Sequence, residues 1–318
     1  MSWQVLIQSD VEPYVTITEL LGQADIKLHW WRDEAPEADT DFGVIDAIYS
    51  YGHFAVTGAL MRQCPQLKIV SNFGVGCDHI DQAAAIQLGI PVGNTPGVLD
   101  DTTADLTWAL LLAAARNIVR GDAFARGPDF RRYDASFMLG QQVTGGTIGI
   151  VGLGRIGYQV AKRALGFDMP ILYHNRSRNE AAEKELGARW VELDELLETS
   201  DFITLNMPLT EDTTGMIGAR EFERMKKTAV VVNVARGPVW DQEALLATLR
   251  SGHLHAAATD VTYPEPLPRD HDLLEEERLV LLPHLGSATR QTRDAMARMS
   301  VVNLLAGLQG NRVPHRIA

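Results

Sequence analysis

Cysteine is scarce in this sequence. Cys64 and Cys77 are the only two among 318 residues, and they form no Cys-x-x-Cys pair. Two separated cysteines predict neither a disulfide framework nor a zinc site, and they suit the reducing cytoplasm. We therefore expect a cytoplasmic protein that holds no metal ion and depends on no disulfide.

Long apolar runs and an excess of positive charge are missing as well. The longest apolar run, Trp108–Ala115, is far shorter than the ~18 residues of a membrane-spanning helix. The opening MSWQVLIQSD lacks the basic and apolar regions of a secretory signal. The net charge of −12 disfavours nucleic acid and membrane surfaces as partners. We expect a globular protein with small-molecule partners, in which an anionic ligand needs a locally positive pocket.

What the sequence does contain, at residues 147–157, is the segment TIGIVGLGRIG. A strand rich in isoleucine and valine leads directly into Gly152, Gly154 and Gly157, and a helix-compatible stretch follows. In this spacing the first glycine permits a tight turn, the second lets a pyrophosphate approach the backbone, and the third lets the helix pack on the strand. The helix N-terminus adds unpaired N–H groups and a positive dipole end. The segment therefore predicts a dinucleotide-binding site.

Short apolar runs alternate with helical patterns over nearly the whole chain, which is typical of a parallel α/β architecture. The length also exceeds the about 100–200 residues of one domain. We predict two doubly wound parallel-sheet domains with a cleft between them. One comprises residues 1–99 and 287–318, and the other comprises residues 100–286 around the glycine segment.

The predicted elements follow from this alternation. The strands are Val5–Ile7, Ile26–His29, Ala47–Tyr49, Leu67–Val70, Ile90–Val92, Thr147–Val151, Ile171–His174, Phe202–Leu205, Ala229–Val232, Ala256–Asp260 and Leu279–Leu282. The clearest helices are residues 83–88, 103–124 with Thr102 or Thr103 as cap, 241–251 with Gly252 just beyond the end, and 288–308. Residues 127–146 are predicted to be irregular.

The end of the second strand after the glycines bears on which dinucleotide binds. An NAD-preferring site has an acidic residue there, about 20 residues on, that bonds the ribose 2′-OH. This chain has LYHNRSRNE instead, with no carboxylate at residues 174–176. Asn175 can hydrogen-bond without repelling a phosphate, and Arg176 can hold one by forked contacts, with Ser177 beside it. We predict NADPH, with NADH weaker; a solvated basic loop remains the alternative.

Three later segments, VNVARGPVWDQEAL, AATDVTYPEPLP and LLPHLGSAT, resemble the signature segments of the D-isomer-specific 2-hydroxyacid dehydrogenases. FGVGCDHID and NTPGVLDDTTADLTWALLLAAAR are similar to that family too, so the likeness covers essentially the whole chain. DVTYPEPLP, HLGSAT and NRSR most resemble its glyoxylate/hydroxypyruvate reductase branch. The resemblance implies a flavodoxin-like substrate domain and a Rossmann NAD(P)-binding domain. It also implies NADPH-dependent reduction of a small 2-oxo acid, glyoxylate or hydroxypyruvate.

The same resemblance makes Arg236, Glu265 and His284 the catalytic residues, and their chemistry agrees. Reducing a 2-oxo acid requires a hydride donor, a proton donor for the carbonyl oxygen, and a cation for the carboxylate. An imidazole titrates near neutrality and suits the proton donor, with Glu265 fixing its tautomer. Arg236 can form a forked contact with a carboxylate. Taken singly, each residue is as well explained by a loop or a surface; their order within the resembling segments favours catalysis.

Further positions are implied by the resemblance. Val75 and Gly76 match a loop whose N–H groups receive the substrate carboxylate, with Ser287 as a further substrate contact; a simple tight turn would also explain the first two. The additional positions that match cofactor contacts are Arg155, Ile156, Pro208, Val234, Asp260 and Gly286. Asp260 matches a residue that contacts the nicotinamide amide, although it and Pro208 are equally well explained as ordinary strand-end residues.

The resemblance also implies a homodimer. Residues 106–115 are predicted to be either a dimer face or a buried core helix. Phe137 stands where the reductase branch usually has a tryptophan thought to reach the neighbouring subunit's active site. This departure leaves the selectivity for the substrate side chain open.

Two other functions stay open. Another dehydrogenase of the scaffold would take broader 2-oxo acids, formate or phosphite. Glu265 and the missing acid at Asn175 count against an NAD-linked formate oxidiser, which typically carries an amide in place of that glutamate. A nucleotide-sensing corepressor on the same scaffold is disfavoured because we find no flanking disordered interaction segments.

Overall fold

The computed structural model describes residues 2–32, 35–36 and 40–318, and the chain divides into two units. Unit 1 comprises Met1–Leu99 and Ala288–Ala318, and unit 2 comprises Asp100–Ser287. These limits differ from the predicted ranges only at Ser287. Among the described residues, none of the helices has the length and apolar character needed to cross a lipid bilayer.

Unit 1 is built on a six-stranded sheet in the order β3-β2-β1-β4-β5-β6. The strands are β1 Trp3–Gln8, β2 Ile26–Arg32, β3 Ala35–Pro36, β4 Ala47–Ser50, β5 Ile69–Asn72 and β6 Val92–Gly93. All pair in parallel except β3, an antiparallel edge strand that was not predicted. Without β3 the order is that of the flavodoxin-like fold, so the predicted architecture of this unit is confirmed.

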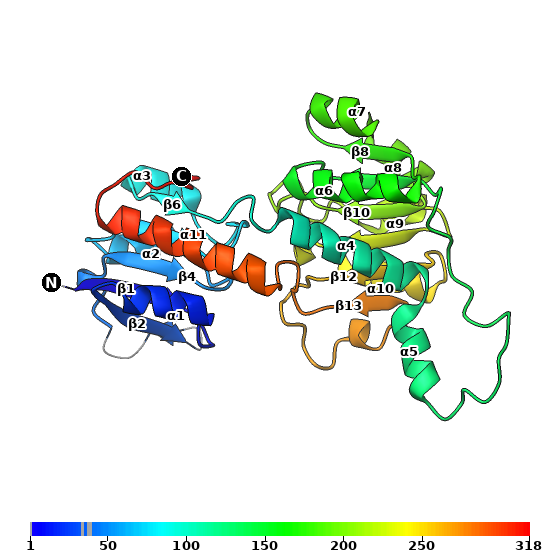
Figure 1. Cartoon of the computed structure of the whole chain (residues 1–318), viewed down its shortest axis with the longest axis horizontal. Helices are drawn as coiled ribbons and strands as arrows, with labels where there is room; N and C mark the ends of the chain where they lie inside the picture. Colours follow the sequence, from blue (N-terminus) through cyan, green and yellow to red (C-terminus); the bar gives the residue numbers. More distant parts are fainter. Residues whose placement is uncertain (1, 33–34, 37–39) are drawn as a thin grey trace. The chain divides into compact units, whose positions relative to one another are not determined.

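In the part of unit 1 that the structure describes, four helices cover this sheet (Figure 1). They are α1 Val15–Gly22, α2 Gly58–Gln63, α3 Gln82–Leu88 and α11 Arg290–Leu308. Apolar side chains of α2 and α3 pack with Leu6, Ile48 and Val70 in one core. Helix α11 packs against β5 and α1. Oγ of its Ser300 lies 2.7 Å from the hydroxyl oxygen of the buried Tyr49. The C-terminal helix is therefore an integral part of unit 1.

Unit 2 contains a seven-stranded, fully parallel sheet in the order β13-β12-β11-β10-β7-β8-β9. The strands are β7 Ile148–Val151, β8 Ile171–His174, β9 Arg189–Trp190, β10 Phe202–Leu205, β11 Val230–Asn233, β12 Ala256–Thr259 and β13 Leu279–Leu281. Alternate residues enter two different cores, with Val230 and Val232 in one and Val231 in the other. The sheet is buried on both faces, as in a doubly wound fold. The predicted doubly wound parallel sheet of this unit is therefore confirmed.

Seven helices belong to unit 2. They are α4 Asp100–Ala115, α5 Ile118–Arg126, α6 Arg155–Ala164, α7 Glu180–Leu186, α8 Leu193–Thr199, α9 Ala219–Arg224 and α10 Gln242–Arg250. Figure 1 shows α4 and α6 side by side on one face of the sheet, and α8, α9 and α10 contribute to the core of the other. Gly252, at φ +76°, follows the end of α10 as predicted.

The prediction of one continuous helix over residues 103–124 is wrong. Helix α4 begins earlier, at Asp100, and ends at Ala115, because Asn117 adopts the left-handed conformation at φ +53° before α5 begins. Asparagine tolerates this conformation better than most residues. Most of α4 is buried, and the indole N–H of Trp108 donates to the carbonyl of Val160 at 3.1 Å. The structure therefore favours the core interpretation of residues 106–115.

Helix α5 and the irregular residues 127–142 together form a segment that we call the arm. In Figure 1 the arm runs away from the sheet of unit 2 before the chain returns to β7. The structure confirms that residues 127–146 contain no helix or strand.

Candidate active site

Three of the predicted site residues follow three neighbouring strands of unit 2. Arg236 comes after β11, Glu265 after β12 and His284 after β13, and these strands are adjacent and parallel. Because the carboxyl ends of parallel strands lie along one edge of the sheet, the three residues reach the same edge. α/β proteins bind their ligands at this edge.

Glu265 and His284 are in direct contact. Oε1 of Glu265 lies 2.6 Å from Nδ1 of His284, and each side chain is 32% exposed. Oε2 of Glu265 accepts a hydrogen bond from the backbone N–H of Thr262 at 3.0 Å. Both oxygens of the Glu265 carboxylate are therefore hydrogen-bonded. Because Nδ1 of His284 faces this carboxylate, proton exchange between His284 and a ligand has to run through Nε2.

The turn that carries His284 is organised by Asp260. His284 has a φ of +57°, which is uncommon for a residue with a side chain. Asp260 is 2% exposed; Oδ1 accepts from the N–H of Leu285 at 2.6 Å and Oδ2 from that of Gly286 at 2.7 Å. Its carbonyl accepts from the N–H of His284 at 2.9 Å. Burial raises the pKa of Asp260, and the hydrogen bond from Leu285 opposes the shift.

Arg236 lies in a loop that is shaped by two buried contacts. The fully buried Asn233 donates through Nδ2 to the carbonyl of Arg236 at 2.9 Å. At the next residue, Gly237, an added Cβ would lie 2.1 Å from the carbonyl oxygen of Thr262. Only glycine lets the loop of Arg236 approach the segment that leads to Glu265.

A pocket of about 320 Å³ lies over the carboxyl ends of β7, β8 and β10. Between β7 and β10 the strand order reverses, and doubly wound sheets bind nucleotides at such a point. The predicted cofactor residues that line this pocket are Gly152, Gly154, Asn175, Arg176, Ser177 and Pro208. The predicted cofactor residues outside its lining are Arg155, Ile156, Gly157, Val234, Asp260 and Gly286.

The glycine turn at the pocket has no room for side chains at two of its three positions. Gly152 has a φ of +96°, and a Cβ there would lie 2.5 Å from the backbone nitrogen of Met207. A Cβ on Gly157 would lie 2.2 Å from the carbonyl oxygen of Gly152. Around Gly154, the residue before α6, the space is open. The turn therefore exposes backbone where the helix begins.

The loop after β8 uses its polar residues in three different ways. Asn175 accepts a hydrogen bond from the N–H of Leu153 at 2.7 Å, so its side chain holds the glycine turn. Arg178 donates twice to Glu183, and these bonds lower the pKa of Glu183 to about 2. Arg176 lines the pocket with an exposed side chain, and no hydrogen bond or ion pair engages it within the described residues. Arg176 is thus the arginine available to a ligand.

Sequence reasoning missed several residues of this pocket. They are Val151, His174, Asn206, Met207, Thr210, Asp212, Thr213 and Met216. Both polar atoms of the Asn206 side chain are buried, and neither has a hydrogen-bond partner in the part of the chain that the structure describes. Buried amides are rarely left unsatisfied, which points to a polar ligand. Its place directly after strand Phe202–Leu205 was the signal that could have identified it.

The remaining predicted residues, Val75, Gly76 and Ser287, belong to different units. Val75 and Gly76 lie in the loop after β5 of unit 1, and both are half-exposed. Ser287 is the last residue of unit 2 and is half-buried.

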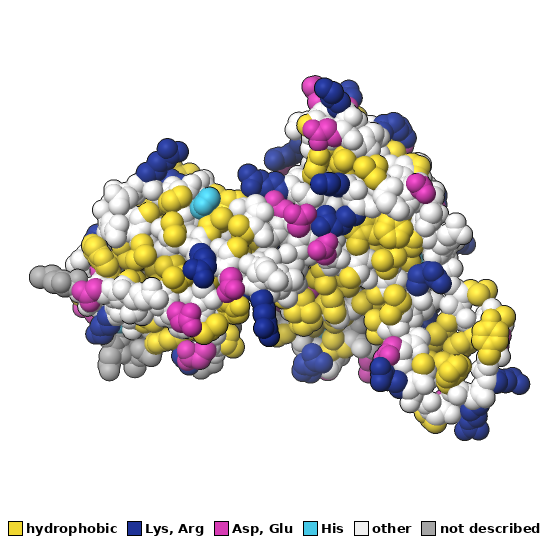
Figure 2. All heavy atoms as spheres, in the orientation of Figure 1, with side chains coloured by type: hydrophobic (Ala, Val, Ile, Leu, Met, Phe, Trp, Pro, Cys, Tyr) yellow, Lys and Arg dark blue, Asp and Glu magenta, His cyan; other side chains and the backbone are white. Residues whose placement is uncertain are grey.

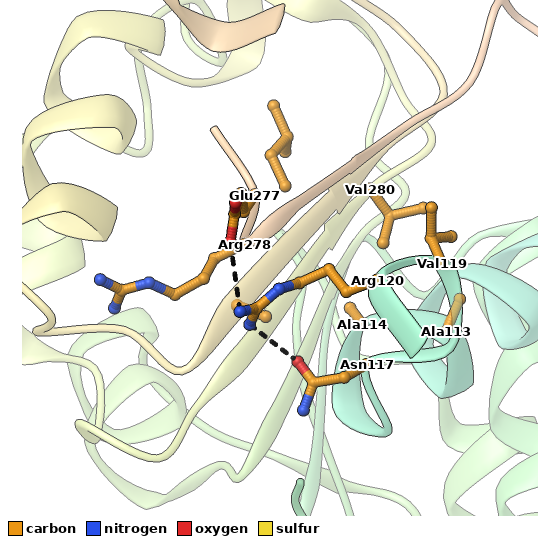
Figure 3. A pocket seen from close by; sticks show the side chains of 10 residues that line it. Ala113, Ala114, Asn117, Val119, Arg120, Glu277, Arg278 and Val280 are labelled. Carbon is orange, nitrogen blue, oxygen red and sulfur yellow. Dashed lines mark hydrogen bonds and ion pairs between the residues drawn. The ribbon is translucent and has the colours of Figure 1, made fainter. Parts of the chain in front are cut away.

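Another pocket of unit 2 lies near the amino ends of β12 and β13, beside the start of α5 (Figure 3). Nη2 of Arg120 lies 3.2 Å from Oε2 of Glu277, and Nη1 donates to the side chain of Asn117 at 3.4 Å. Its volume of about 30 Å³ is about a tenth of that of the pocket over β7, β8 and β10, which is about 320 Å³. This pocket cannot hold a dinucleotide.

Comparisons with known proteins agree with the geometry. The model of the family described as "D-isomer specific 2-hydroxyacid dehydrogenase, NAD binding domain" matches residues 108–286. The glyoxylate reductase of Korarchaeum cryptofilum is 43% identical over 322 residues, 96% of each chain. That of Thermococcus litoralis is 40% identical over 322 residues, 96% of this chain and 97% of its own.

Among solved structures, the NADPH-dependent glyoxylate/hydroxypyruvate reductase of Sinorhizobium meliloti, in complex with NADP and malonate, is similar with a TM-score of 0.90. The two chains are 30% identical, and the match covers 100% of this chain and 97% of that one. A glyoxylate reductase of Paecilomyes thermophila has a TM-score of 0.85 at 30% identity, covering 99% and 97%.

Proposed function

The chain belongs to the D-isomer specific 2-hydroxyacid dehydrogenase family, and we propose that it reduces glyoxylate or hydroxypyruvate with NADPH, to glycolate or D-glycerate. The observation that carries this proposal is the contact of 2.6 Å between Glu265 and His284. It supplies an oriented proton donor at the sheet edge that also carries Arg236.

In the proposed reaction His284 gives its proton from Nε2 to the carbonyl oxygen of the 2-oxo acid. When bound, NADPH would supply a hydride and be oxidised to NADP+. The carbonyl carbon would accept that hydride, so the C=O double bond would become a C–O single bond with new C–H and O–H bonds. Glu265 stabilises the imidazolium before transfer and keeps its ring oriented. Arg236 forms a forked contact with the substrate carboxylate. The imidazole then regains a proton from water.

The residues of unit 2 fit a dinucleotide. Open backbone at Gly154 and the first N–H groups of α6 suit a pyrophosphate. The unsatisfied amide of Asn206 offers a donor and an acceptor in the same pocket. We therefore assign the dinucleotide to unit 2.

The preference for NADPH rests on Arg176. Its guanidinium lines the pocket and can bind the 2′-phosphate by forked, charge-assisted hydrogen bonds. No carboxylate stands at residues 174–176 to bond a ribose 2′-OH or to repel the phosphate. NADH lacks the phosphate and binds more weakly.

A steady-state panel tests this function. Glyoxylate, hydroxypyruvate, pyruvate and a larger 2-oxo acid are each assayed with NADPH and with NADH by the loss of nicotinamide absorbance. We expect the highest kcat/KM for glyoxylate or hydroxypyruvate with NADPH. As the competing reaction, formate and phosphite are each assayed as substrates with NADP and with NAD. Turnover of either, with none of any 2-oxo acid, would refute the proposed reaction.

The proposal includes a homodimer that buries the arm. Figure 2 shows hydrophobic side chains over this region. Within the arm, Tyr133 is 85% and Leu139 71% exposed. Phe130 and Phe137 are also exposed, and both pack on Phe124. Monomeric proteins rarely expose so many large apolar groups together. Light scattering after gel filtration should give twice the chain mass, and Tyr133→Asp with Leu139→Asp should give the monomer mass.

A further inference from the structure

Neighbouring strands of unit 1 end in a row of buried polar residues. Gln8 ends β1, Ser50 ends β4 and Asn72 ends β5, and these three are register partners across the sheet. Asn94 follows β6 directly. Two residues earlier on the same strands the sheet carries core residues, namely Leu6, Ile48, Val70 and Val92. The row closes this core at the carboxyl edge, where the loop after β5 begins.

Asn72 holds two carbonyl groups of that loop. Its Nδ2 donates to the carbonyl of Gly74 at 3.1 Å and to that of Gly76 at 2.9 Å, and it lies 3.4 Å from Sγ of Cys77. Asn72 is 1% exposed, so these contacts are made away from water. A buried amide that lost these acceptors would be left unsatisfied, which favours this arrangement strongly.

Asn94 holds the carbonyl that lies between those two. Its Nδ2 donates to the carbonyl of Val75 at 2.9 Å, and the next N–H, of Thr95, donates to the carbonyl of Gly74 at 3.1 Å. Asn94 is itself fixed by α11, because Nδ2 of Asn303 donates to its carbonyl at 2.9 Å. The carbonyls of residues 74–76 therefore all face buried donors.

Fixing these carbonyls also fixes the N–H groups of the loop. In a peptide unit the C=O and the following N–H point in opposite directions, so an inward carbonyl on Gly74 or Val75 turns the next N–H outward. In the described part of the chain, no group accepts a hydrogen bond from the N–H of Gly74, Val75 or Gly76, and all three residues are half-exposed. Successive unpaired backbone N–H groups of this kind bind anions.

We propose that Asn72 and Asn94 are positioning residues for the substrate carboxylate. They hold the loop of residues 74–76 so that the N–H groups of Val75 and Gly76 are aimed at the anion before it arrives. The inference rests on the proposed function, since it takes the 2-oxo acid as that anion. Neither amide touches the substrate, and both act through the peptide planes of the loop.

The test replaces each amide by a carboxylate of the same shape. In Asn72→Asp or Asn94→Asp the new oxygens repel the loop carbonyls and attract its N–H groups, which turns the peptides away from the substrate. We expect KM for the 2-oxo acid to rise about 10- to 100-fold, because hydrogen bonds to a charged group are lost. The carboxylate contact is the same in the ground and transition states, so kcat should change far less. Binding of NADPH, followed by fluorescence, should be unchanged.

Ser71→Ala is the matched control. Ser71 directly precedes Asn72 and is fully buried, and its Oγ donates to the carbonyl of Ser300 in α11 at 2.7 Å. Its replacement removes a buried polar group without touching the loop. KM and kcat of this variant should equal those of the wild type. If it raises KM as much as the asparagine variants do, the effect is one of general core stability and the inference is wrong.

Two further measurements make every outcome decisive. Hydrogen–deuterium exchange of the wild type with NADPH should show that oxalate, a small dicarboxylate, protects the amides of Val75 and Gly76. Absence of protection overturns the inference even if both asparagine variants fail to fold. An active wild type whose asparagine variants keep their KM overturns it as well. A wild type inactive on every 2-oxo acid refutes the proposed function instead. Oxalate titration then still decides the inference, since weaker binding by both variants supports it and equal binding overturns it.

Discussion

Glu265 binds Nδ1 of His284 at 2.6 Å while its second oxygen accepts the N–H of Thr262. Such a carboxylate orients the imidazole and stabilises its charge without donating the proton itself. We therefore expect His284→Ala to lower kcat about 10²–10⁴-fold, with NADPH binding unchanged in a fluorescence titration. Unaltered turnover would exclude His284 as the proton donor.

Glu265→Gln distinguishes the orienting role of Glu265 on the His284 ring from the role of its negative charge. Glutamine keeps an oxygen for one N–H donor but loses the negative charge that stabilises the imidazolium. We expect kcat to fall by about tenfold, less than in His284→Ala, since the proton donor is still present. A loss as large as that of His284→Ala would mean that Glu265 takes part in the proton transfer directly.

Arg176 and Arg178 provide a matched pair for the cofactor preference. Arg178 is held by Glu183, whereas Arg176 lines the pocket. Arg176→Ala should raise KM for NADPH about 10- to 100-fold, because a charge-assisted contact with the phosphate is lost. KM for NADH should change little.

The control for this prediction is Arg178→Ala, which removes the same charge from the same loop. It should leave KM for NADPH within a small factor of the wild-type value, because its guanidinium is bound to Glu183. Equal effects of the two variants, or equal effects of Arg176→Ala on NADPH and NADH, would contradict the role of Arg176.

The strands of unit 2 could be predicted because parallel strands buried on both faces are continuous apolar runs, as in VVVN of β11. The two-residue strands β3 and β9 carry no such signal. The break between α4 and α5 was also invisible, because residues 116–126 have ordinary helix-compatible types. Whether Asn117 adopts a left-handed conformation depends on what the arm packs against, which a local pattern does not contain.

At the candidate site, the sequence identified residues whose spacing follows from backbone geometry. Gly152 and Gly157 are required by close approaches that any such strand–turn–helix unit makes. The sequence did not identify the hydrogen-bond partners of the polar residues. Asn175, expected to face the cofactor, lines the pocket, and its side-chain oxygen also accepts a hydrogen bond from the N–H of Leu153. Such partners are set by loops that meet in space from distant parts of the chain.

Asp260 offers a test of how the turn of His284 is held. In Asp260→Asn one of the two backbone N–H groups, from Leu285 or Gly286, would face an NH₂ group in place of an oxygen. The left-handed turn should loosen, and we expect kcat to fall about 10- to 100-fold through misplacement of the imidazole. Crystallographic or NMR data on the variant should show a displaced His284 ring. A wild-type kcat would mean that the turn is held without this carboxylate.

His255 provides a prediction on stability at acid pH. It precedes β12, and its Nδ1 lies 3.3 Å from Nε2 of Gln141. Burial lowers the pKa of His255, and the charges of Arg278 and Arg120 lower it further, while a hydrogen bond with the backbone of Ala115 opposes the shift. The charged imidazole is therefore disfavoured in the folded protein.

The sign of the effect follows from proton linkage. An unfolded histidine titrates at about 6.5, so below that pH the unfolded chain binds a proton that folded His255 does not. The free energy of unfolding must then decrease as pH falls below about 6.5, towards the lowered pKa of the folded state. In His255→Gln this contribution is absent. Thermal midpoints measured from about pH 7.5 to 5.5 should fall more steeply for the wild type, while Gln141→Ala, which keeps the imidazole, should retain the wild-type slope. Parallel curves for the wild type and His255→Gln would show that His255 does not resist protonation in the fold.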